Sequence, residues 1–150
     1  MTMKQAFWIH GTSVQAEREG YFISKQRAGF AAIFKTHGEE WFHFAIPTPV
    51  ILNGKDTTLE KIFLFYMTKG TAKITNIHIH DAVKTIESFK NLSLSGDHST
   101  KIDQYNSWGI SPVHVKFGLG ISVHVDFGPA TKLGVPEVRF ASAGADFQTP

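Results

Sequence analysis

Cysteine is absent from the sequence, and so are long apolar runs and clusters of one charge. Without cysteine the chain has neither a disulfide framework nor a thiol nucleophile. No run approaches the roughly 20 apolar residues that a membrane-spanning helix needs. The residues before Phe7 also lack the apolar stretch of a signal peptide. We therefore predict a cytoplasmic protein with no membrane partner.

Basic residues are too scattered to favour nucleic-acid binding. The formal charge is +2 with the eight histidines neutral, and the densest basic group, Lys25 with Arg27, is too sparse to follow a phosphate backbone. We predict no nucleic-acid partner. Protonation of the histidines near pH 6 raises the charge, so solubility or assembly is expected to depend on pH.

Aromatic side chains and alternating patterns are abundant, with 13 Phe, 3 Trp and 3 Tyr. Between Val113 and Phe127 every odd-numbered residue is apolar, and polar residues or glycine fall between them. Successive side chains of a strand point to opposite faces, so this pattern predicts an antiparallel sheet with one buried face. Similar short runs recur along the chain. We predict one domain over residues 1–150, an all-β antiparallel β-sandwich of jelly-roll type with about eight to eleven strands.

Turn residues suggest how some strands connect. Gly38 after His37 predicts a hairpin in which Phe34 pairs with Trp41, leaving both rings on the outer face, and Lys69-Gly70 predicts a second connection. An unbroken strand over residues 113–127 would span about 50 Å. A break near Gly118 to Gly120, with His114 opposite His124, is one interpretation of that stretch, and a bent continuous strand is the other.

Two groups of residues are candidate ligand sites. The first follows the strand end at Leu94, in a loop that combines an acid, an imidazole, hydroxyls and aromatic rings. Its residue types also suit a plain turn, and no strained Gly-x-Ser-x-Gly turn supports a serine hydrolase. The second is an outward pair on the strand predicted over Glu40–Ile46. The predicted ligand-binding residues are Asp97, His98, Tyr105 and Trp108 in the first group, and Trp41 and His43 in the second.

His78-Ile79-His80 places two imidazoles on one strand face, and His114 and His124 are two further candidate metal ligands. The pair resembles the His-x-His of cupins. However, cupins place an acidic ligand four or five residues after the second histidine, and here Glu87 is seven residues beyond His80. The later Pro-x-Gly-x-x-His element is missing too. We expect no metal and no cofactor.

Several segments resemble an uncharacterised family of small bacterial β-sandwich proteins, a domain of unknown function. That resemblance extends over almost the whole chain and implies no activity, cofactor or catalytic residue. The resembling segments are Trp8–Gly11, Trp41–Pro49, Leu92–His98, Gly118–Val123 and Ser142–Phe147.

The prediction for function is a non-catalytic module for binding or assembly that recognises a small molecule, a glycan or a partner subunit, with homo-oligomers expected. The alternative is a small enzyme. It would be metal-dependent through the four histidines named above, or a metal-free acid/base catalyst that uses His98 with Asp97. A third interpretation is a structural, self-assembling subunit.

Overall fold

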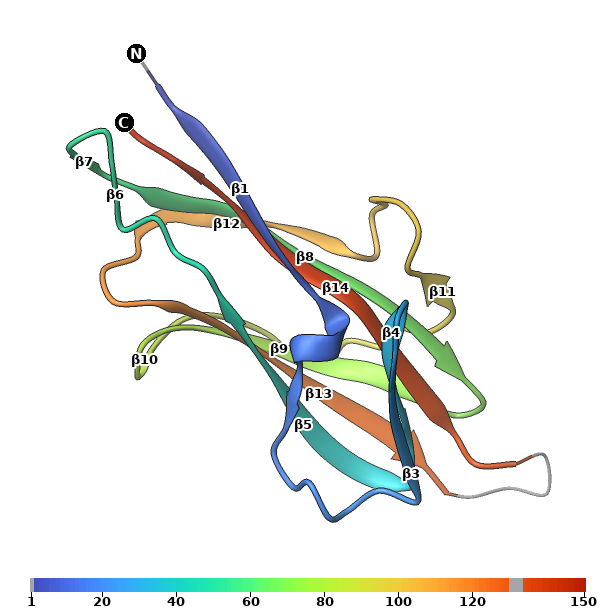
Figure 1. Cartoon of the computed structure of the whole chain (residues 1–150). Coiled ribbons are helices and arrows are strands. Elements are labelled where there is room, and N and C mark those ends of the chain that lie inside the picture. The colour runs from blue at the N-terminus through green and yellow to red at the C-terminus, as the bar shows by residue number, and fades with distance from the viewer. Residues whose placement is uncertain (1, 130–133) are drawn as a thin grey trace.

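The computed structural model describes residues 2–129 and 134–150 and is built from β-strands (Figure 1). A seven-stranded sheet contains β1 (Lys4–His10), β3 (Ser24–Ala28), β4 (Ala31–Lys35), β8 (Thr58–Lys69), β11 (Asp97–His98), β12 (Ser107–His114) and β14 (Glu137–Gln148). A five-stranded sheet contains β2 (Gln15–Ala16), β5 (Gly38–Ile46), β9 (Lys73–Asp81), β10 (Lys84–Phe89) and β13 (Leu119–Gly128). The hairpin of β6 (Ile51–Leu52) and β7 (Lys55–Asp56) and the 3₁₀ turn η1 (Gly11–Ser13) complete the described elements.

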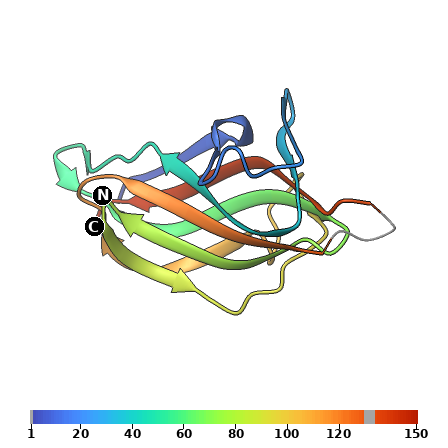
Figure 2. The ribbon, with the colours of Figure 1, turned by 90° about the horizontal axis from the view of Figure 1, so that it is seen from below.

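The two large sheets form two layers that pack face to face, seen from the side in Figure 1 and from below in Figure 2, and all their pairings are antiparallel. The predicted antiparallel β-sandwich is therefore confirmed. β8 and β14 lie at the centre of the larger sheet, and β13 lies at the centre of the smaller one. The chain changes sheet between β5 and β8, between β8 and β9, and between β12, β13 and β14, which is the alternation of a jelly roll. Among the described residues, no helix has the length and apolar character to cross a membrane.

The alternating stretch behaves as predicted along β13. Its odd-numbered residues from Leu119 to Phe127 are buried between the sheets, and the even-numbered Ser122 and His124 face outward. Phe117 departs from the pattern, because its side chain is 79% exposed. It lies in the loop where the chain leaves β12 in one sheet and enters β13 in the other.

This loop is held by the carboxylate of Asp81, which is only 7% exposed. It accepts backbone N–H hydrogen bonds from Lys116 (2.9 Å), Phe117 (2.9 Å) and Gly118 (3.2 Å). Burial by itself would raise the pKa of Asp81, but the three donors outweigh burial and lower it. The predicted break near Gly118 is thus correct. The predicted pairing of His114 with His124 is wrong, because β12 and β13 belong to different sheets.

The predicted hairpin at His37-Gly38 is also wrong. Gly38 does adopt a positive φ of 83°, but β4 and β5 enter opposite sheets instead of pairing. Phe34 therefore points into the core, where its ring lies 4.8 Å from that of Phe42. Lys69-Gly70 likewise connects two sheets, since β8 and β9 do not pair. Phe34 is consequently no part of an outer surface with Trp41.

Candidate functional site

The first predicted group lies in the loop around β11, which pairs with the end of β8. The ring of His98 lies 5.2 Å from the rings of Tyr66 and Tyr105. Its Nδ1 is 2.8 Å from Asp103 Oδ2, and its Nε2 is 3.0 Å from the carbonyl oxygen of Ser95. A hollow of about 220 Å³ adjoins this cluster. Both ring nitrogens are thus occupied by acceptors of the loop itself.

Two of the four residues predicted here do not line this hollow. Asp97 accepts hydrogen bonds from the backbone and hydroxyl of Ser99 and does not line the hollow. Trp108 packs near Phe89, with ring centroids 6.2 Å apart, on the core side of β12. The carboxylate beside His98 is therefore that of Asp103 and not that of Asp97, which corrects the acid/base pair named above.

Asn106 ties the two ends of this loop together. It is fully buried, its amide donates to the carbonyl oxygens of His98 (3.1 Å) and Lys101 (2.7 Å), and it accepts from the backbone N–H of Asp103 (2.8 Å). The hydrogen bond from His98 also lowers the pKa of Asp103. Most polar groups of the loop therefore satisfy one another and leave few free for a ligand.

The second predicted pair lies at the centre of a polar surface on the outer side of the five-stranded sheet. Trp41 lies between two imidazoles, with ring centroids 4.9 Å from His78 and 4.9 Å from His124. The register explains this arrangement, because β13 pairs with β5 on one side and with β9 on the other. We call this surface the histidine face; it consists of Trp41, His43, His78, His80, Ser122 and His124.

Hydrogen bonds hold several of these side chains in place. His43 Nδ1 lies 2.8 Å from Ser122 Oγ, and its Nε2 lies 3.1 Å from Glu17 Oε1. His80 Nε2 lies 3.0 Å from Thr85 Oγ1. Trp41, His43, His80 and Glu17 line, with His78 and Ser122, an open hollow of about 220 Å³. Apart from Glu17, which follows β2, the side chains around the hollow therefore come from strands of the five-stranded sheet.

His78 differs from the other imidazoles of the face. Within residues 2–129 and 134–150, its Nε2 is buried and has no hydrogen-bond partner. Burial lowers the pKa of His78, and the nearby charges of His80, Lys90 and His124 lower it further. At neutral pH the ring is therefore uncharged.

The four histidines considered as metal ligands are not brought together. His78, His80 and His124 belong to the histidine face, whereas His114 lies on β12 of the other sheet, with its Nδ1 3.1 Å from the carbonyl oxygen of Thr57. In the part of the chain that the structure describes, no three His, Cys, Asp or Glu residues are arranged to hold a metal ion. The metal-dependent alternative thus has no assembled ligand set.

Sequence reasoning missed two parts of this surface. Glu17 follows the short strand β2, and its contact with His43 depends on the pairing of β2 with β5. Trp41 and His43 of β5 lie near His78 and His80 of β9 because β13 lies between these two strands. The alternating pattern shows which side chains share a face of one strand, but no local signal indicates the order of strands in a sheet.

Comparison with known proteins gives a family and two distant structures. Residues 2–145 match the model described as "Family of unknown function (DUF6623)", which confirms the resemblance to an uncharacterised family. TmCBM61, solved in complex with beta-1,4-galactotriose, is 12% identical with a TM-score of 0.46, over 95% of this chain and 86% of that chain. The Podospora anserina GH26-CBM35 beta-(1,4)-mannanase is 11% identical with a TM-score of 0.44, over 93% of this chain and 27% of that chain. A search of the curated proteins finds no match. At these TM-scores the two structures support no functional argument.

Proposed function

We propose that this chain, which belongs to the family of unknown function DUF6623, is a non-catalytic glycan-binding module that uses the histidine face. One observation carries the proposal. An indole ring and polar side chains from three strands meet around one open hollow, and hydrogen bonds hold the polar groups in place. Pre-organised groups lose little conformational entropy when a ligand binds.

The chemistry of the hollow suits a sugar ring. A sugar presents apolar C–H groups together with hydroxyls that both donate and accept hydrogen bonds. Trp41 supplies a flat apolar surface on which the C–H groups of the sugar can pack. Glu17 accepts hydrogen bonds, and Ser122 both donates and accepts them. Hydrogen-bonding groups beside an aromatic ring suit a hydroxylated ligand.

The size of the hollow restricts how much of a ligand it accommodates. Its volume of about 220 Å³ is below the range of about 300–1,000 Å³ typical of small-molecule pockets. It lies on the outer side of a sheet, open to solvent. This geometry suits one ring of a longer chain that continues across the surface.

Calorimetric titration with a panel of soluble glycans tests the proposal, with β-1,4-galactotriose and β-1,4-mannan oligosaccharides included as probes. Truncating a central aromatic residue of an interface commonly costs about 2 kcal/mol, or about 30-fold in affinity. We expect that loss for Trp41→Ala and a smaller one for His43→Ala.

Tyr105→Ala is the matched control, because Tyr105 is an exposed aromatic residue (49%) beside the His98 hollow. It should leave the affinity unchanged. If the Tyr105 variant loses binding while the Trp41 variant keeps it, the loop is the ligand site and the histidine face is not.

A further inference from the structure

We infer that the outer face of the seven-stranded sheet carries a second glycan-binding surface, built on Trp8 and on a polar hollow beside it. Its ligand class rests on the proposed function, but its residues and its side of the molecule are different. We call it the Trp8 face. It consists of Lys4, Ala6, Trp8, Glu60, Lys61, Phe63, Phe65, Asp146 and Gln148.

Trp8 forms a rigid platform because of the residue beneath it. The register places Gly144 of β14 between Trp8 of β1 and Phe63 of β8. A Cβ at Gly144 would lie only 2.5 Å from the indole, so only glycine lets the ring lie down across β14. The indole then stacks on Phe63 at 4.8 Å with planes 25° apart and meets the edge of Phe65 at 5.1 Å. Even so, Trp8 remains 38% exposed.

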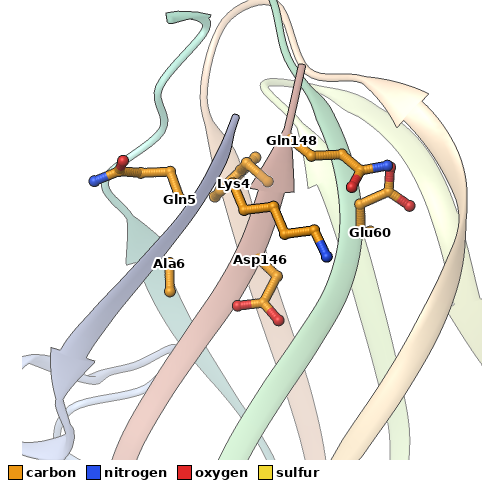
Figure 3. A pocket seen from close by; sticks show the side chains of 7 residues that line it. Lys4, Gln5, Ala6, Glu60, Asp146 and Gln148 are labelled. Carbon is orange, nitrogen blue, oxygen red and sulfur yellow. The ribbon is translucent and has the colours of Figure 1, made fainter. Parts of the chain in front are cut away.

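A hollow of about 370 Å³ lies next to this platform along β1. Ala6 lies two residues before Trp8 and pairs with Asp146. Because its side chain is short, the hollow beside it stays open. Figure 3 shows the side chains of Lys4, Glu60, Asp146 and Gln148 around this space. Carboxylates, an amide and an ammonium group thus line the hollow beside the short side chain of Ala6.

Within the hollow, Asp146 is the group that would gain most from hydrogen bonds with a ligand. Burial raises its pKa, and the charges of Lys61 and Lys4 offset burial only in part. A carboxylate that has lost part of its hydration gains when hydroxyl groups of a ligand donate to it. The two lysines balance the charges of Asp146 and Glu60, so the surface has no net preference for an ion of either sign. An uncharged hydroxylated ligand fits this balance.

The distance between platform and hollow indicates an oligosaccharide. Trp8 and Lys4 both face outward on β1, four residues apart, which corresponds to roughly 13 Å of strand. A ligand that contacts both therefore spans more than one sugar ring. The histidine face lies on the other sheet, so one molecule that uses both faces would connect two glycan chains.

The test uses the full chain with β-1,4-galactan and β-1,4-mannan, as hexasaccharides for calorimetry and as polymers for turbidity. For the wild type we expect two sites per chain and turbidity with polymer. Trp8→Ala and the milder Asp146→Asn should each weaken one site by about tenfold or more and remove the turbidity. Phe117→Ala, which truncates an exposed ring in the loop between the sheets, should change neither readout.

The outcomes separate this inference from the proposed function. If Trp8→Ala and Asp146→Asn leave stoichiometry and turbidity unchanged, the second surface is overturned while the histidine face stands. If these variants abolish all binding and Trp41→Ala abolishes none, the Trp8 face stands and the histidine face fails. A wild-type dimer in sedimentation that Trp8→Ala dissociates would make this face a subunit interface, which also overturns the inference.

Discussion

The two outer faces of the sandwich each carry a tryptophan among polar groups, but they hold it by different means. On the histidine face, Trp41 lies between two imidazoles, and hydrogen bonds of His43 and His80 fix the surroundings. On the Trp8 face, the indole is held by ring packing that a glycine makes possible. The first face should therefore respond to pH, and the second should respond to added side-chain volume.

The largest effect should come from Gly144→Ala. The new Cβ would meet the indole of Trp8 at 2.5 Å, so the ring must move off Phe63. Overpacking of this kind costs about 1–3 kcal/mol of unfolding free energy, which urea denaturation measures directly. The fluorescence of Trp8 should change as well.

Gly120→Ala is the control for Gly144→Ala, because Gly120 lies on β13 of the sheet that carries the histidine face. An added Cβ at Gly120 would meet nothing closer than the carbonyl oxygen of Phe44 at 4.0 Å. This variant should stay within about 0.5 kcal/mol of the wild type or gain slightly in stability. If both glycine variants lose the same free energy of unfolding, the missing Cβ at Gly144 is not what allows the Trp8 ring to lie across β14.

The contrast between the faces also shows what sequence reasoning can reach. Alternation along a strand placed Trp41 with His43, and His78 with His80, on outward faces, and the structure confirms both pairs. The same reasoning did not reveal the Trp8 platform. Its cause is Gly144, on a strand near the other end of the chain, and only the pairing of β1 with β14 brings the two together.

Turn residues were equally limited as a guide to connections. Gly38 has the positive φ that a hairpin turn requires, and the flanking runs would form favourable cross-strand pairs. A hairpin and a crossover between sheets use similar turn residues. The choice is made by distant partners, β14 for β4 and β13 for β5, which a local pattern does not contain.

The next effect concerns acid stability on the histidine face. The pKa of His78 is lowered by burial and by its charged neighbours, below a usual value of 6.5. As pH falls through 6.5, the unfolded chain takes up a proton that the folded protein resists, so the free energy of unfolding decreases. His78→Gln should remove this part of the pH dependence between pH 7.5 and 5, as followed by urea denaturation. His37→Gln, at an exposed position before β5, should retain it.

The smallest effect should come from Asp146→Asn, and it has the opposite pH trend. Burial raises the pKa of Asp146, so the folded protein binds a proton more tightly than the unfolded chain does. The ionised carboxylate therefore weakens the fold once pH rises above the usual value of 3.8, up to the raised folded value, and stays unfavourable at neutral pH. The amide should stabilise the ligand-free protein at pH 7 by less than about 1 kcal/mol, and the difference should vanish in acid. Because the same substitution is expected to weaken glycan binding, a variant that is more stable and binds less would indicate that the charge is retained for the ligand. A variant less stable than the wild type at pH 7 would instead give the carboxylate a structural role.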